Sequence, residues 1–235
     1  MSTRPANTHV NITFEALVNV DEQIAHLKDG AYSKAASPER FETTRAALEA
    51  KGFKVTVAED KDDAFEKLRS LIPAGVSLNN AHSTTLEEIG FVDYLKGETS
   101  YNNVHAAILA ETDPIKQATM RRVLGTTVDY FLTSMAAVTE NGELAHGDFS
   151  GTKVGGVSYG AKNVIVVVGS NKIVKDEAEA YKRTMEWCVP VACAFTRQIL
   201  NIPGTEILNY ELIRGASPLT PGRIHILFIK EALGV

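Results

Sequence analysis

The chain has 235 residues and a mass of 25.5 kDa, enough for one sizeable domain that buries roughly 70–75% of its unfolded surface. Hydrophobic residues make up 44% of the sequence and charged residues 23%, a composition that excludes wholesale disorder. The net charge of −5 disfavours a protein that coats nucleic acid or an acidic membrane through charge alone. The two cysteines, Cys188 and Cys193, are too few for a disulfide scaffold or for a four-thiolate iron–sulfur cluster from this chain alone.

The sequence carries no membrane or secretion signal. The longest apolar run is Val164–Val168, whereas a bilayer-spanning helix requires about 20 apolar residues. The N-terminal sequence has neither a continuous apolar segment nor an A-x-A-like cleavage site. We therefore expect a soluble protein of the reducing cytoplasm, with neither membrane nor nucleic acid as a partner.

Glycine, proline and helix-capping residues divide the sequence into alternating helices and strands. Ser37 and Pro38 begin the first helix and Gly52 follows its end, a typical start-and-stop pattern. Asn141-Gly142 is the strongest two-residue hairpin signal in the chain. The elements expected in chain order are helix 37–51, strand 53–57, helix 60–72, strand 76–78, helix 86–95, helix 113–124, strand 128–132, strand 136–138 with a hairpin turn at 140–143, strand 163–169, helix 176–188 and strand 223–229.

This alternation predicts the fold class. Strands and helices at this spacing make right-handed βαβ units, in which helices cover a mostly parallel sheet. We therefore expect an α/β protein with three layers. The hairpin should add antiparallel character in the middle of the sheet, and no linker is long enough to separate independent domains.

The loop over residues 79–85 is the first candidate binding segment. In open α/β sheets, ligands collect beyond the carboxyl ends of the strands, and this loop follows the strand at 76–78. Free backbone N–H groups at a helix start, together with hydroxyl side chains, favour an anion. The candidate ligand-binding residues are Asn80, His82, Ser83, Thr84 and Thr85. The alternative is that these residues only cap the helix, with Thr84 and Glu87 or Thr85 and Glu88 at capping-box spacing.

A glycine-rich segment over residues 141–160 is the second candidate. Glycine allows the backbone to approach a ligand closely, and a single lysine supplies a point charge for a phosphate or carboxylate. The candidate residues are Gly151, Thr152, Lys153, Gly155 and Gly156. The alternative is that the glycines serve turns and bulges, which leaves Lys153 among small residues unexplained.

The third candidate directly follows the most apolar strand. Asn171 and Lys172 lie at its carboxyl end, where Lys172 would join Lys153 at the same anion. The alternative is a solvated lysine at a tight turn.

Catalytic and metal-binding patterns are weak. Glu140 and Asp148 are the candidates for a general base or nucleophile, although carboxylates beside a hairpin turn are usually only solvated. His82, His146 and Asp148 lack metal-binding spacing, and a triad of Ser83, His82 and Asp148 lacks the nucleophile elbow. We therefore expect neither a metal nor a cofactor.

Five segments together resemble the lactate-utilisation (LUD) domain family. They are AHSTTLEEIGFVDYL, DYFLTSMAAVTENGEL, DFSGTKVGG, AKNVIVVVGSNKIV and GRIHILFIKEALG, in matching order and spacing. The resemblance extends over residues 35–235, which leaves residues 1–34 as an N-terminal helical extension. It implies the fold of the glucosamine-6-phosphate deaminase, ribose-5-phosphate isomerase and CoA-transferase-like superfamily, a Rossmann-like sheet with ligands at strand ends.

The resemblance also implies a function and partners. Bacterial members are encoded with iron–sulfur oxidoreductase subunits that convert L-lactate to pyruvate, so this chain is similar to the small subunit of such a system. Superfamily members often form homo-oligomers. Many family members carry a cysteine-rich stretch between the last helix and the last strand, whereas residues 194–221 contain no cysteine. Iron–sulfur ligation by that stretch therefore does not carry over.

Three functions remain open at this point. The first is a protein of organic-acid metabolism that binds a small anionic metabolite at the strand ends. The second is a stand-alone enzyme that acts on a phosphosugar or a CoA thioester. The third is a non-catalytic interaction module.

Overall fold

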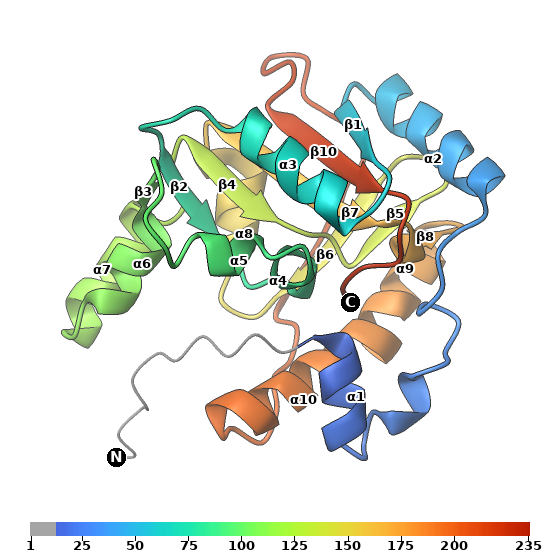
Figure 1. Ribbon diagram of the computed structural model, residues 1–235, viewed down its shortest axis with the longest axis horizontal. Coiled ribbons are helices and arrows are strands. Elements are labelled where there is room, and N and C mark those ends of the chain that lie inside the picture. Colours follow the sequence, from blue (N-terminus) through green and yellow to red (C-terminus); the bar gives the residue numbers. More distant parts are fainter. Residues whose placement is uncertain (1–12) are drawn as a thin grey trace.

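Six parallel strands form the central sheet of the computed structural model, which describes residues 13–235 (Figure 1). Their order across the sheet is β1-β10-β7-β4-β2-β3, and each neighbouring pair is parallel. The strands are β1 (Lys54–Ala58), β2 (Ser77–Asn80), β3 (Asn102–Asn103), β4 (Tyr130–Thr133), β7 (Asn163–Gly169) and β10 (Ile224–Ile229). The predicted α/β class with a mostly parallel sheet is confirmed.

Strand β7 lies inside the sheet and contributes to both of its faces. Val164, Val166 and Val168 pack into one hydrophobic cluster, whereas Ile165 and Val167 pack into another. Successive side chains of a strand point to opposite faces, so an apolar run of this kind is stable only where both faces are covered.

Helices provide that cover and produce the three expected layers. One face carries α2 (Pro38–Ala50) and α6 (Val104–Ala110), and the other carries α3 (Lys61–Leu71), α4 (Thr84–Glu88) and α5 (Phe91–Tyr94). On the first face, Phe41 of α2 stacks on Phe228 of β10 with ring centroids 4.1 Å apart. The sheet core therefore lies between two helical layers.

Helix starts follow the capping signals, with one correction. Ser37 accepts a hydrogen bond from the backbone N–H of Arg40 at the start of α2, as expected. The helix predicted over 86–95 is wrong, because Gly90 has a φ of 79° and separates α4 from α5. Ser83 caps α4 by accepting from the N–H of Leu86, in place of the predicted capping boxes at Thr84 or Thr85.

The hairpin belongs to a second, smaller sheet. Its order is β8-β5-β6-β9, with bounds β5 (Ala137–Thr139), β6 (Leu144–Asp148), β8 (Ile173–Val174) and β9 (Asn209–Ile213). Strands β5 and β6 are antiparallel around Gly142, which has a φ of 83°. The antiparallel character therefore lies beside the main sheet and not in its middle, which corrects the expectation.

A long helical segment follows β8 and extends beyond the predicted end at residue 188. It comprises α9 (Glu177–Arg183), a π-helical turn (Thr184–Cys188) and α10 (Val189–Leu200). Pro190 lies directly after the π-helical turn, at the second residue of α10, and the helix continues through it.

The helices near the N-terminus pack on α10. They are α1 (Phe14–Val20) and a short 3₁₀ helix (Ala25–Leu27), and residues 1–12 of the predicted extension lie outside the described residues. Leu17 and Val18 of α1 form a hydrophobic cluster with Trp187 and Val191. Figure 1 accordingly shows α1 beside α10, below the main sheet.

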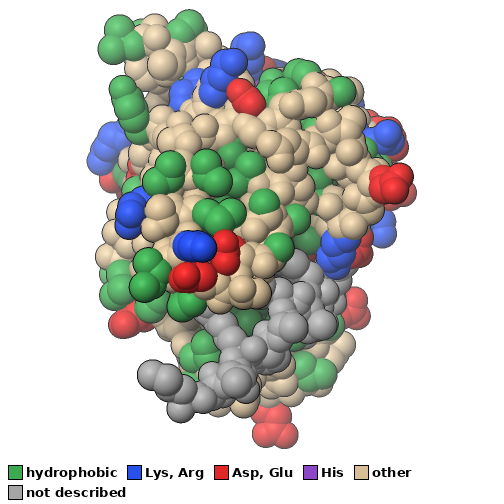
Figure 2. All heavy atoms as spheres, turned by 90° about the vertical axis from the view of Figure 1, so that its left-hand side faces the viewer, with side chains coloured by type: hydrophobic (Ala, Val, Ile, Leu, Met, Phe, Trp, Pro, Cys, Tyr) green, Lys and Arg blue, Asp and Glu red, His purple; other side chains and the backbone are tan. Residues whose placement is uncertain are grey.

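The outer surface near α6 is chemically mixed. Helix α7 (Pro114–Val123) follows α6 and has no buried residue. Figure 2 shows acidic and basic side chains interspersed on this side of the molecule.

Within residues 13–235, no helix has both the length and the apolar composition to cross a bilayer.

Candidate functional site

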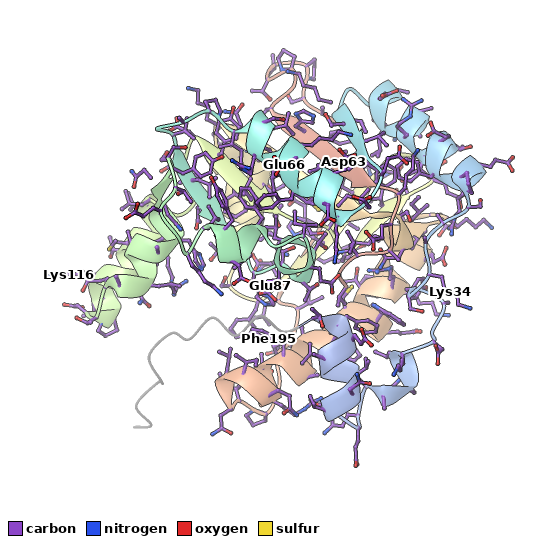
Figure 3. All side chains as sticks on the ribbon, viewed as in Figure 1. Lys34, Asp63, Glu66, Glu87, Lys116 and Phe195 are labelled. Carbon is purple, nitrogen blue, oxygen red and sulfur yellow. The ribbon has the colours of Figure 1, made fainter. Side chains whose placement is uncertain are left out.

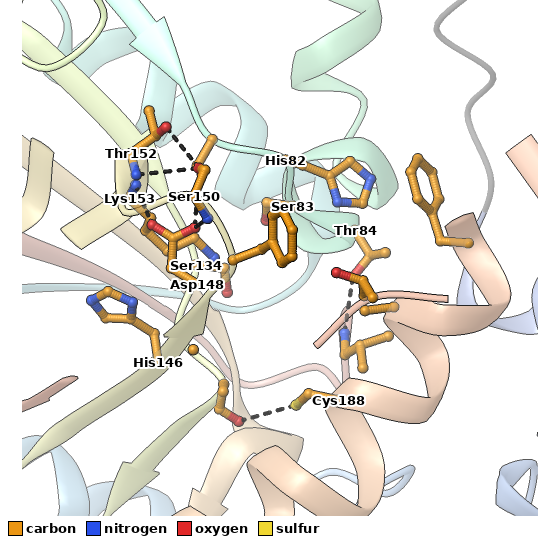
Figure 4. A pocket seen from close by; sticks show the side chains of 18 of the residues that line it. His82, Ser83, Thr84, Ser134, His146, Asp148, Ser150, Thr152, Lys153 and Cys188 are labelled. Carbon is orange, nitrogen blue, oxygen red and sulfur yellow. Dashed lines mark hydrogen bonds between the residues drawn. The ribbon is translucent and has the colours of Figure 1, made fainter. Parts of the chain in front are cut away.

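A pocket of about 480 Å³ lies beyond the carboxyl ends of β2, β4 and β7 (Figure 4). Its floor includes Asn80 at the end of β2, Ser134 immediately after β4, and Lys172 after β7. This is the edge at which an open parallel sheet is expected to bind ligands. The volume falls within the range of pockets that hold small molecules.

Helix α10 forms the opposite wall. Val191, Ala192 and Phe195 line the pocket from this helix. Phe131 of β4 and Ile108 of α6 also line it. These side chains make much of the wall apolar. The pocket therefore fits a ligand that has both an apolar part and a polar group.

His82 connects the two walls. Its ring lies 4.1 Å from that of Phe195, centroid to centroid, and its Nε2 lies 3.4 Å from Glu87 Oε1. Figure 3 shows Glu87 of α4 and Phe195 of α10 facing one another across the space between the layers. The Glu87 side chain is buried, and its Oε2 has no hydrogen-bond partner among the described residues.

The loop after β2 contributes most of its predicted residues to the pocket. Asn80, His82, Ser83 and Thr84 line it. Thr85 does not, because its side chain is fully buried and its Oγ1 lies 2.9 Å from Lys172 Nζ. Ser83 therefore has two roles, because its hydroxyl caps α4 and the residue also lines the pocket.

Lys153 lies across the pocket from His82. It belongs to α8 (Thr152–Gly155), a single turn that Asp148 begins by accepting backbone N–H bonds from Lys153 and Val154 at 2.7 and 3.3 Å. Lys153, Thr152 and Asp148 all line the pocket. Desolvation lowers the pKa of Lys153, partly offset by the negative charge of Asp148. Within residues 13–235, no atom accepts a hydrogen bond from Lys153 Nζ.

The glycines around Lys153 are explained by packing. A Cβ on Gly156 would lie 2.8 Å from the Phe131 ring, and one on Gly155 would lie 3.2 Å from the Thr126 side chain. Gly151 has a φ of 83° at the start of α8. These three predicted ligand-binding residues lie outside the pocket wall.

Lys172 is buried, with 1% of its surface exposed, and all its donors are used. Its Nζ donates to Thr85 Oγ1 and Ser134 Oγ, both at 2.9 Å, and to the Val235 carbonyl at 2.6 Å. Desolvation, together with the charge of Arg183, lowers its pKa to about 7. Lys172 is therefore a poorer anion ligand than Lys153. Near neutral pH, a much larger fraction of its amine is unprotonated than in an ordinary lysine, so it is available to accept a proton.

Two further predicted residues lie elsewhere. Asn171 is buried and ties the chain together, because its Nδ2 donates to the Gly234 carbonyl and its Oδ1 accepts from the N–H of Leu233. Glu140 lies at the hairpin turn and pairs with Arg40 at 2.6 Å, outside the pocket. Of the two weak catalytic candidates, only Asp148 lines the site.

A histidine in the pocket wall forms a pair with a carboxylate outside the pocket lining, and this pair was not predicted from the sequence. His146 of β6 lies opposite Glu211 of β9, with 2.7 Å between His146 Nε2 and Glu211 Oε2. Desolvation lowers the pKa of His146. Although burial raises the pKa of Glu211, hydrogen bonds from His146 and Ser158 bring it below its ordinary value. Because an ionised carboxylate only accepts, Nε2 carries the proton and Nδ1, which has no partner among the described residues, is a free acceptor.

Other pocket residues that carry chemistry were also missed. Ser134, Cys188 and Arg121 line the wall. The residues that α10 contributes to the pocket were not predicted, because the predicted helix ended at residue 188. Ser134 follows a predicted strand, so its position at a strand end was a readable signal. The pairing of His146 with Glu211 required the unpredicted β9.

No metal centre accompanies these residues. Among residues 13–235, no group of three or more His, Cys, Asp or Glu side chains is arranged to hold an ion. The polar groups of the pocket include two lysines, hydroxyls and imidazoles, which can bind anions and move protons, together with the carboxylates of Asp148 and Glu206.

Comparison with known proteins identifies one family. The LUD domain model matches residues 41–229. A crystal structure of a DUF162 family protein from Deinococcus radiodurans is similar, with 15% identity, a TM-score of 0.45, and coverage of 81% of this chain and 96% of that one. The tetrameric eIF2B-beta2-delta2 complex from C. thermophilum has 13% identity and a TM-score of 0.28, over 93% of this chain and 62% of that one. No curated protein sequence matches the chain.

Proposed function

Because the chain belongs to the LUD domain family, which is associated with lactate utilisation, we propose that it binds a small organic anion in the pocket at the ends of β2, β4 and β7. The ligand is a metabolite of organic-acid metabolism, held by its negative group at Lys153. The proposal concerns binding and does not depend on a partner subunit.

The ammonium group of Lys153 carries this proposal. Its charge is partly desolvated in the pocket wall, and no described oxygen accepts from it. Desolvation makes the charged form of this amine costly, and a ligand carboxylate or phosphate would supply a negatively charged acceptor that stabilises it. Lys172 differs because its three donors already have acceptors.

The size and lining of the pocket describe the rest of the ligand. A cavity of about 480 Å³ has room for a ligand much larger than lactate. Phe131, Ile108 and Phe195 offer apolar contacts to the body of such a ligand. An acyl or sugar derivative of an organic acid therefore fits the space better than the free acid.

Calorimetric titration tests the proposal. Lactate, pyruvate, inorganic phosphate, a sugar phosphate and a CoA thioester are titrated into the wild-type chain, Lys153→Gln and Lys162→Gln. Lys162 is a matched control because its side chain is 76% exposed and it does not line the pocket.

We expect at least one of these anions to bind the wild type and to bind Lys153→Gln about 10-fold to 100-fold more weakly, the usual worth of a charge-assisted hydrogen bond. Lys162→Gln should bind as the wild type does. Equal affinity of Lys153→Gln and the wild type for every ligand that binds would remove Lys153 from the site.

A further inference from the structure

Ser134 and Lys172 form a hydroxyl–amine pair on the floor of the pocket. Ser134 Oγ and Lys172 Nζ lie 2.9 Å apart, and both residues line the cavity. We propose that Ser134 is a nucleophile, that Lys172 is its general base, and that the protein transfers the acyl group of an organic-acid ester or thioester to water.

The sheet fixes this geometry. Ser134 follows the last residue of β4 and Lys172 lies just beyond the end of β7, and these two strands are neighbours in parallel register. Ser134 is 6% exposed and Lys172 is 1% exposed, so bulk water does not separate the two groups. Thr85 Oγ1 lies 3.2 Å from Ser134 Oγ and 2.9 Å from Lys172 Nζ, which holds both side chains in place.

The surroundings favour a neutral amine at Lys172. Burial and the charges of Arg183 and Lys153 lower its pKa, whereas Cys188 and Glu88 act in the opposite direction. The pKa of about 7 means that roughly half of the population carries an unprotonated amine at neutral pH. A neutral amine accepts the hydroxyl proton of Ser134 over the same 2.9 Å along which an ammonium donates.

The reaction needs only the acyl compound and water. Lys172 Nζ takes the proton from Ser134 Oγ, and the oxygen attacks the acyl carbon, whose C=O electron pair moves onto its oxygen. The tetrahedral adduct expels the alcohol or thiol, which takes the proton from Lys172. Water then attacks the acyl-serine by the same steps and releases the acid and the free hydroxyl of Ser134. This is the logic of a serine–lysine dyad.

The substrate class agrees with the walls of the pocket. Lys153 offers a positive charge for an acidic group of the substrate, and the apolar residues of α10 offer contacts to its remaining part. The inference goes beyond the proposed binding function, because an acyl group can react at Ser134 even if Lys153 contributes nothing to affinity. The two proposals therefore fail in different experiments.

Covalent labelling with a fluorophosphonate tests the dyad. The full-length chain is incubated with the reagent, intact mass is followed with time, and peptide mapping locates the adduct. We expect one adduct per chain, on Ser134, and none in Ser134→Ala. Ser150→Ala is the matched control, because Ser150 also lines the pocket but its Oγ hydrogen-bonds with Asp148 and Thr152 and with no described lysine.

Lys172→Met tests the base while leaving the nucleophile in place. We expect its labelling rate to fall at least about 100-fold, the usual contribution of general-base assistance. If this variant does not fold, the wild-type rate decides, and we expect it to rise through about pH 7 as Lys172 loses its proton. The proposal is overturned by an unlabelled wild type, by an adduct that persists in Ser134→Ala, by wild-type labelling of folded Lys172→Met, or by a rate that stays constant from pH 6 to 9.

Discussion

Lys172 should make the stability of the protein rise with pH, and replacing it with methionine should remove that dependence. The folded-state pKa is about 7, lowered from an ordinary value of 10.5. Between these two values, the unfolded chain holds a proton on Lys172 that the folded chain has released. Raising the pH through this range therefore favours the folded state.

The size of the effect follows from the shift. Each pKa unit corresponds to about 1.4 kcal/mol, so the complete shift is worth about 5 kcal/mol, of which about 4 kcal/mol is gained between pH 7 and pH 10.5. Between pH 7 and pH 9, where most proteins are still convenient to handle, the same linkage gives about 2 kcal/mol. Methionine fills a similar volume and does not titrate, although it leaves the acceptors Thr85 Oγ1, Ser134 Oγ and the Val235 carbonyl without this donor.

Urea unfolding at pH 7, 8 and 9 measures the difference. The single tryptophan, Trp187, is 3% exposed and reports unfolding by fluorescence. Groups remote from Lys172 titrate equally in both chains, so the free energy of unfolding of the wild type minus that of Lys172→Met reports the contribution of Lys172 and of the charges coupled to it. We expect this difference to grow by about 2 kcal/mol from pH 7 to pH 9. Parallel pH profiles of the two proteins would show that Lys172 keeps an ordinary pKa and would refute the reasoning.

Two further predictions concern the walls of the pocket. Gly156→Ala should lower the free energy of unfolding by about 1–3 kcal/mol in chemical denaturation, because the new Cβ would lie 2.8 Å from the ring of the buried Phe131. An unchanged denaturation midpoint would show that this ring moves freely. In nitrogen-detected NMR spectra, the neutral form of His146 should predominate at about pH 6.5, with its proton on Nε2, because desolvation lowers its pKa and Glu211 accepts from that nitrogen. A signal from an Nδ1-protonated ring would contradict the assigned pair.

The parallel sheet was predictable because its signals are local. The apolar run in β7 and the start and end of α2 depend on periodicity and capping, which are readable over a few neighbouring residues. The fold class therefore followed from the sequence. The break at Gly90 was missed because a single left-handed residue overrides an otherwise helical pattern.

The floor of the pocket was partly predictable, whereas its walls were not. Asn80, His82 and Lys172 follow expected strands, so their position at the carboxyl edge of the sheet could be anticipated. His82 and Lys153 also line the same pocket, as the shared anion site requires. The contribution of Phe195 depends on how α10 packs against the loop after β2, which is a tertiary contact without a local signal.

The glycines near Lys153 illustrate a different limit. Their density was interpreted as room for a ligand, yet Gly156 makes room for Phe131 and Gly155 for Thr126. A glycine indicates that something approaches the backbone closely, but the sequence does not say whether that neighbour is a ligand or another side chain.

The π-helical turn between α9 and α10 decides which way α10 faces. In this turn the N–H of Val189 bonds to the carbonyl of Thr184, five residues earlier. The corresponding bond of an α-helix joins residues four apart, so the π-helical turn contains one extra residue. Residues after the turn are thereby rotated about the helix axis by about 100° relative to an uninterrupted α-helix. The continuous helical segment from α9 to α10 therefore packs Ala180 against the small sheet and places Phe195, a few turns later, in the pocket wall. The single extra residue of the π-helical turn sets the rotation of α10 about its axis, and this rotation determines which of its side chains line the pocket.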